Sequence, residues 1–138
     1  MSDIVSADRL VKRFRKQTVL DGVTFSLPRG SVTGLIGENG VGKTTLIRLL
    51  LGLFEANRGA SRVFGLPSLR CAETIRQRAG YVPDEYRFDE GLTAEALCRF
   101  VGAFYPTWDD AYAGQLLERL HLANGGKITT YSKGMKAR

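Results

Sequence analysis

A glycine-rich run in the first third of the chain constrains the fold more than any other feature. It matches the pattern G-x-x-x-x-G-K-S/T and lies between an apolar segment, 31–36, and a helical pattern, 45–51. In that setting the backbone amides of the loop and the N-terminus of the helix point at one place, which favours a bound phosphate. The fixed positions of the pattern are Gly37, Gly42, Lys43 and Thr44.

The residue types in this loop predict the binding of MgATP. Glycines let the main chain curl so that several N–H groups face phosphate oxygens. The Lys43 ammonium can reach the β- and γ-phosphates, and the Thr44 hydroxyl can ligate Mg²⁺. The alternative is a glycine turn that precedes a helix and binds nothing. The candidate ATP-binding residues in this stretch are Gly37, Glu38, Asn39, Gly40, Val41, Gly42, Lys43, Thr44 and Thr45.

Length and charge set broad limits on function. The chain has 138 residues, which fits one modest domain. Its formal charge of +6 could attract nucleic acid or anionic lipid, or it could suit a polyphosphate ligand and a solvated surface. No nucleic-acid motif accompanies the densest basic run, 9–16, so we expect no nucleic-acid partner. Cys71 and Cys98 lack the spacing of metal ligands, and two free thiols are the simplest account of them.

The sequence offers no candidate membrane span. The most apolar stretch, 46–54, is far shorter than the ~20 residues that cross a membrane, and it contains Arg48. An acid, Asp3, stands where a signal peptide would carry bases. We therefore expect no direct membrane insertion, and any role at a membrane would come through a partner.

Hydrophobic periodicity predicts two halves of different character. An α/β half covers 1–84, and a helical half covers 85–138. Since strands and helices alternate around the glycine-rich loop, we expect the loop to belong to an α/β fold. In the first half the strand patterns are 23–27, 31–36, 61–64 and 80–82, and the helical patterns are 45–51 and 72–78.

The helical half carries two amphipathic patterns that Pro106 separates. Thr107 is the expected cap at the start of the second helix, which should end at Asn124-Gly125-Gly126. We expect Trp108 to pack within this half and His121 to lie at its surface or boundary. The predicted apolar faces consist of Leu97, Phe100, Val101, Phe104, Tyr112, Leu116, Leu117 and Leu120.

The run Tyr131-Ser132-Lys133-Gly134-Met135 resembles the signature of ATP-binding cassette (ABC) transporter ATPases, Leu-Ser-Gly-Gly-Gln. It keeps Ser132 and Gly134 and departs at Tyr131, Lys133 and Met135. The resemblance extends over nearly the whole chain, and it implies the core sheet of a P-loop NTPase, followed by a helical subdomain that ends in the signature. The stretch 104–109 is similar to a drug- or lipid-exporter-like bacterial branch of the family.

The resemblance also implies roles for single residues. Phe14 occupies the position where the family has an aromatic residue that stacks on adenine. The alternative is that Phe14 is only a core or strand-edge residue. Asp84 occupies the position of the family's Q-loop glutamine. It would then be a ligand of Mg²⁺ and, together with Lys43, a catalytic residue; the alternative is a solvated acid in a loop. The signature residues that would contact ATP held by a second ATP-binding domain, in a head-to-tail dimer, are Ser132, Lys133, Gly134 and Met135.

The family further implies membrane-spanning permease subunits as partners. The chain would then be cytoplasmic and peripheral on the cytoplasmic face of the cell membrane, where ATP hydrolysis is coupled to transport. The sequence ends at Arg138, before the family's Walker B Asp, catalytic Glu and switch His. We therefore expect binding of ATP with little hydrolysis. The alternatives are a non-hydrolysing fragment or remnant, and a soluble ABC protein that acts on ribosomes or DNA.

Overall fold

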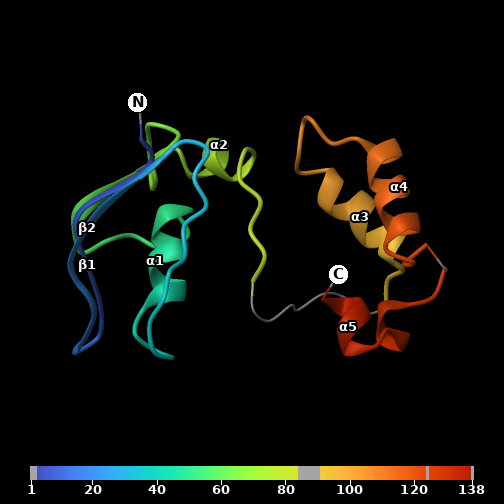
Figure 1. The fold of residues 1–138 in the computed structure, drawn as a ribbon, viewed down its shortest axis with the longest axis horizontal. Coiled ribbons are helices and arrows are strands. Elements are labelled where there is room, and N and C mark those ends of the chain that lie inside the picture. Colours follow the sequence, from blue (N-terminus) through green and yellow to red (C-terminus); the bar gives the residue numbers. More distant parts are fainter. Residues whose placement is uncertain (1–2, 84–90, 124, 138) are drawn as a thin grey trace. The chain divides into compact units, whose positions relative to one another are not determined.

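The computed structural model describes residues 3–83, 91–123 and 125–137. The chain divides into two compact units, Met1–Gly80 and Tyr81–Arg138, which are drawn in Figure 1. The predicted boundary between 84 and 85 lies outside the described residues, so it stays a prediction. Within the described residues, no helix combines the length and the apolar character that a membrane crossing requires.

The first unit is built on an antiparallel sheet. Its strand order is β2-β1-β3-β4, and each neighbouring pair is antiparallel. Apolar and polar residues alternate along β2, so one face of the sheet is apolar and the other is solvated. The strands are β1 (Asp3–Phe14), β2 (Gln17–Pro28), β3 (Arg58–Val63) and β4 (Leu66–Pro67).

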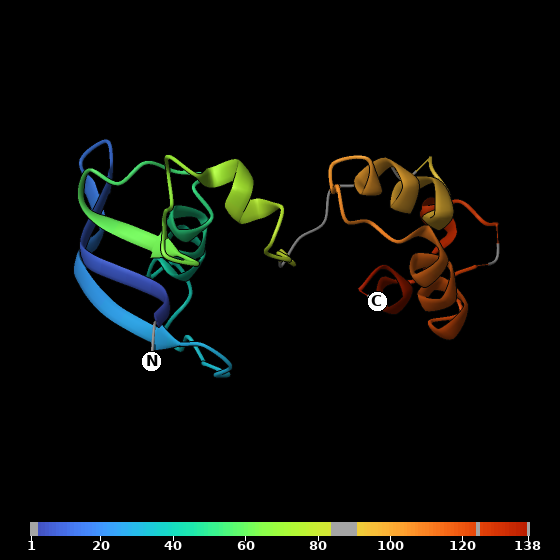
Figure 2. The same cartoon turned by 90° about the horizontal axis from the view of Figure 1, so that it is seen from above.

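Helix α1 (Lys43–Leu50) lies against the apolar face of this sheet (Figure 1, Figure 2). Its Leu46 and Leu49 are three residues apart, which puts both side chains on the inner face of the helix. The short helix α2 (Ala72–Arg76) follows β4 and buries Ile75 completely. The core between the sheet and α1 consists of Ala7, Leu10, Leu20, Leu46 and Leu49.

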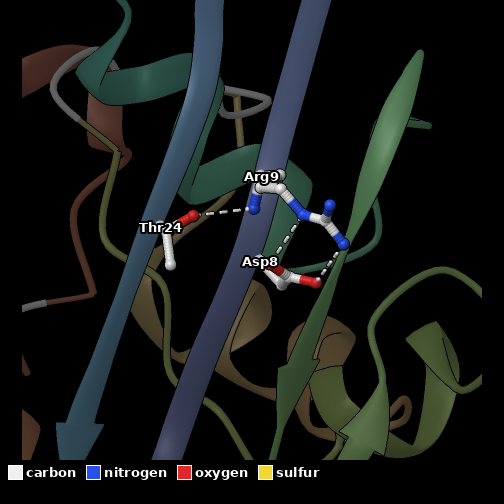
Figure 3. A network of polar contacts seen from close by, with 3 residues as sticks. All are labelled: Asp8, Arg9 and Thr24. Carbon is white, nitrogen blue, oxygen red and sulfur yellow. Dashed lines mark hydrogen bonds and ion pairs between the residues drawn. The ribbon is translucent and has the colours of Figure 1, made fainter.

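Strand β1 was not among the predicted strands, because a bulge breaks its alternation. Ala7 and Leu10 are both buried although they are three residues apart. Between them Arg9 adopts a left-handed backbone with φ of 47°, and its N–H donates to the Thr24 hydroxyl at 2.9 Å (Figure 3). Its guanidinium also contacts the Asp8 carboxylate at 3.2 Å. The extra residue shifts the strand's facing pattern, so a period of two cannot be read across it.

Two predicted strands are wrong. Residues 31–36 carry no regular secondary structure, and Val32 and Ile36 are almost fully exposed. Residues 80–82 are also irregular, and Val82 is exposed. Apolar composition alone does not make a strand, because a strand needs a neighbour for its amides and carbonyls. Among the described residues, neither segment has such a neighbour.

The second unit is helical. Its core consists of Ala94, Leu117, Leu122, Ile128 and Tyr131. The Thr93 hydroxyl caps the first helix by accepting the Ala96 N–H. The helices are α3 (Ala94–Gly102), α4 (Asp110–Arg119), the short 3₁₀ turn Ile128–Thr130 and α5 (Lys133–Lys136).

The predicted caps and faces of these helices need correction. Asp109, not Thr107, caps α4, because its carboxylate accepts the Tyr112 N–H at 2.9 Å. The helix ends at Arg119, ahead of the predicted glycine pair. On the apolar faces, three aromatic residues are mostly exposed instead of buried, namely Phe100, Phe104 and Tyr112.

Two single-residue expectations in this unit are confirmed. Trp108 packs closely on Gly102, where an added Cβ would lie 2.7 Å from the indole ring. Its indole N–H donates to Asp110 at 3.0 Å, which fixes the ring against the start of α4. His121 is exposed, as expected of a surface histidine.

Candidate functional site

The glycine-rich loop leads directly into α1, as its sequence pattern requires. Gly42 is the residue before the helix and has a φ of 108°, a conformation that side chains rarely adopt. A Cβ at Gly42 would lie 2.9 Å from Cγ1 of Val19 and 3.0 Å from the Val19 carbonyl oxygen. Glycine is therefore needed twice here, for the turn and for the close approach of β2.

Lys43 turns its side chain back over the loop. Its Nζ donates to the Gly37 carbonyl at 2.6 Å and to the Glu38 carbonyl at 2.7 Å. The ammonium thus lies against the first residues of the loop, and the loop ends at the N-terminus of α1. The first turn of that helix contains no acidic residue. A helix dipole and a full positive charge therefore favour an anion at the same place.

The residues that follow fit a magnesium ion that is held mainly by the phosphates. Thr44 and Thr45 are half-buried in the first turn of α1. Across the described ranges, no three His, Cys, Asp or Glu residues gather to bind a metal. One hydroxyl plus phosphate oxygens suits Mg²⁺, which often takes few protein ligands when it binds with a nucleotide. Asp84, the other predicted ligand, lies outside the described residues.

Phe14 ends β1 and keeps part of its ring open. It is 40% exposed and pairs with Gln17 across the β1–β2 hairpin. Val19, in the same hairpin, lies close to Gly42 at the end of the loop. Phe14 and the loop therefore belong to the same compact unit. Two residues that the sequence analysis did not single out, Lys12 and Phe54, contact its ring. Lys12 could have been found, because it lies two positions before Phe14 on the same strand, whereas nothing local marks Phe54.

The predicted signature residues lie in the other unit, at the start of α5. Ser132 is the N-cap of α5, and its hydroxyl accepts the Met135 N–H at 3.2 Å. Lys133 and Gly134 form the first turn. A hydroxyl that accepts one hydrogen bond still has its own hydrogen to donate. Ser132 can therefore cap the helix and also donate to an anion.

Tyr131, which replaces the signature's leucine, is part of the helical core. It is buried, and its hydroxyl donates to the Leu122 carbonyl at 2.9 Å. Burial raises the pKa of the Tyr131 phenol above its ordinary value, because the charged phenolate would lose its solvation. The buried hydroxyl that this departure from leucine introduces is therefore satisfied by the Leu122 carbonyl.

Comparison with known proteins agrees with this geometry. The profile of a family described as ABC transporter matches residues 20–138. Over 97% of its length the chain is 33% identical to the Nod factor export ATP-binding protein I of Paraburkholderia xenovorans. It is 34% identical, over 98% of its length, to the linearmycin resistance ATP-binding protein LnrL of Bacillus subtilis. A solved ATP-binding subunit of an ABC transporter superposes with a TM-score of 0.84 at 32% identity, over 97% of this chain.

The matches cover most of this chain but only part of the other proteins. The chain spans 46% and 45% of the two curated relatives and 58% of the solved subunit. The predicted P-loop ATPase fold is confirmed by the superposition. The predicted likeness to an exporter branch is confirmed by relatives that are named for export and for drug resistance.

Proposed function

The chain belongs to the ABC transporter family, and from that premise we propose that it is the ATP-binding part of a transporter, with MgATP held at residues 37–45. The observation that carries the proposal is the position of the Lys43 ammonium over the loop, against the Gly37 and Glu38 carbonyls. A triphosphate placed there would meet that cation, the loop amides and the N-terminus of α1 together.

Each residue has its own task in this proposal. Lys43 exchanges its carbonyl acceptors for phosphate oxygens, which accept stronger, charge-assisted hydrogen bonds. Thr44 would supply a hydroxyl oxygen to Mg²⁺, which would accompany the nucleotide and offset the charge of its phosphates. Phe14 stacks on the adenine. Asp84 would contact the same metal ion directly or through water.

The partners also belong to the proposal. Ser132 and the amides at the start of α5 contact ATP held by a second ATP-binding domain, in a head-to-tail dimer. Membrane-spanning permease subunits bind this assembly, which is peripheral on the cytoplasmic face of the membrane. Hydrolysis by the assembled transporter is coupled to export, which the names of the relatives support.

The proposal is tested by calorimetric titration of the 138-residue chain with MgATP. Replacing Lys43 with Ala should weaken binding by about 10- to 100-fold, because hydrogen bonds to charged groups contribute ~1.5–3 kcal/mol. The matched control is Lys16→Ala, which removes the same charge from the exposed β1–β2 turn. Equal affinity for the unaltered chain and the Lys43 variant would contradict the proposal.

A further inference from the structure

The Phe14 ring is held by a second ring and a cation. The centroids of Phe14 and Phe54 lie 5.6 Å apart with their planes at 74°, an edge-to-face pair. The Lys12 Nζ lies 4.9 Å from the centroid of Phe14 and 5.6 Å from that of Phe54. Both arrangements are attractive, because a ring edge and an ammonium each complement the negative face of an aromatic ring.

Hydrogen bonds also join the backbone segments that carry Lys12, Phe14 and Phe54. The Lys12 ammonium donates to the Glu55 carbonyl at 2.7 Å, and the Asn57 N–H donates to the Val11 carbonyl at 2.8 Å. The Arg13 N–H donates to the Asn57 side chain at 2.7 Å. The end of β1 is therefore tied to the segment that follows α1, which carries Phe54 against the core.

These contacts limit how the Phe14 ring can turn. Lys12 covers the ring from one side and Phe54 packs beside it, yet Phe14 remains 40% exposed. An exposed aromatic side chain without such neighbours would lose rotamer freedom when a ligand stacks on it. Ordering the ring beforehand reduces that loss and so strengthens binding.

We propose that Lys12 and Phe54 are positioning residues that hold the Phe14 ring ready to stack on the adenine base. The inference rests on the proposed function, in which Phe14 is the base-stacking residue. It adds that the base contact depends on two residues that do not themselves stack on the base. Lys12 acts through its charge over the ring, and Phe54 acts through its edge-to-face contact with the ring.

The experiment compares two ligands that differ in the base. Calorimetry gives the affinities of the 138-residue chain for MgATP and for magnesium tripolyphosphate, which engages the loop but has no adenine. Lys12→Met and Phe54→Leu should each weaken MgATP binding by about two- to fivefold, the size of an exposed cation–π or aromatic pair, and leave tripolyphosphate binding unchanged. Lys12→Arg and Phe54→Tyr should retain the affinity for MgATP.

Three comparisons make each outcome decisive. Lys16→Met removes the same charge from the same hairpin and should leave the ratio of the two affinities unchanged, because any effect of overall charge acts on both ligands. If Phe14→Ala also leaves the ratio of the two affinities unchanged, the base-stacking role in the proposed function fails. If Phe14→Ala lowers that ratio while Lys12→Met and Phe54→Leu do not, the positioning role alone is overturned. Equal weakening of both ligands by Lys12→Met would also overturn it, because Lys12 would then act on the phosphates.

Discussion

At the scale of single residues, Gly59 faces the bulge in β1 and has almost no room. Its φ is 80°, and an added Cβ would lie 2.2 Å from the Arg9 carbonyl oxygen and 2.4 Å from that of Asp8. Both neighbours are backbone atoms, which cannot swing away as the end of a long side chain can. The bulge and the glycine opposite it therefore depend on each other.

We predict that Gly59→Ala lowers the free energy of unfolding by at least about 2 kcal/mol, through backbone strain and this clash. Gly65→Ala is the matched control, because Gly65 also has a positive φ, 76°, but nothing lies within 4 Å of its added Cβ. Denaturant unfolding of both variants measures the difference. Equal losses in the two would show that the contact with β1 adds nothing.

The residues of the glycine-rich loop could be predicted because their constraints are local. Gly42 has a positive φ, and Lys43 donates to a carbonyl only six positions earlier in the same loop. Both constraints therefore fall within one short stretch of sequence. Lys12 and Phe54 meet only through the fold, since 42 positions separate them in the sequence. Local patterns in the sequence therefore predict the phosphate side of the candidate site and can indicate Lys12, which is two positions from Phe14, but they do not indicate Phe54.

At the scale of elements, helix α5 depends on its cap. It has only four residues, so it gains little from propagation, and the Ser132 hydroxyl satisfies the Met135 N–H. Ser132→Ala should therefore lower the free energy of unfolding of the helical unit by about 0.5–2 kcal/mol. Ser132→Asp should retain most of the stability, since its carboxylate also caps. Thermal unfolding followed by circular dichroism measures both, and an unchanged alanine variant would contradict the role as cap.

Helices were predicted more reliably than strands, for a physical reason. The hydrogen bonds of α1 and α3 close within each helix, so a local pattern is enough to predict that they form. Strand hydrogen bonds join distant segments, and apolar residues in 31–36 do not say which strand lies beside them. Which helix face is buried is also a tertiary property. Phe100 therefore lies on a predicted apolar face and yet is 60% exposed.

At the scale of the whole molecule, charge is divided unevenly. Residues 1–80 contain 13 Lys and Arg against 6 Asp and Glu, whereas 81–138 contain 7 against 8. The net charges are therefore +7 and −1, and the unit that carries the glycine-rich loop is the basic one. Such a field attracts polyanions from solution and is screened by salt.

We predict that the affinity for MgATP falls steadily as the salt concentration rises, because the triphosphate meets a basic unit. Calorimetric titrations from about 0.05 to 0.5 M KCl would show this, since screening lengths shrink severalfold over roughly that range. Adenosine, which carries no phosphate charge, serves as the matched ligand and should respond little. An affinity for MgATP that is independent of salt would contradict a contribution from the overall charge.

The bulge at Arg9 decides which side chains of β1 turn toward α1. Before the bulge, the residue that faces the core is Ala7, which has an odd number. After the bulge, Leu10 is buried and Lys12 donates to the Glu55 carbonyl, and both of these residues have even numbers. Without this switch from odd to even, alternation from Ala7 would direct Val11 and Arg13 inward and send Lys12 and Phe14 to the opposite face. One additional residue in β1 therefore determines the face of the sheet on which the side chain of Phe14 lies.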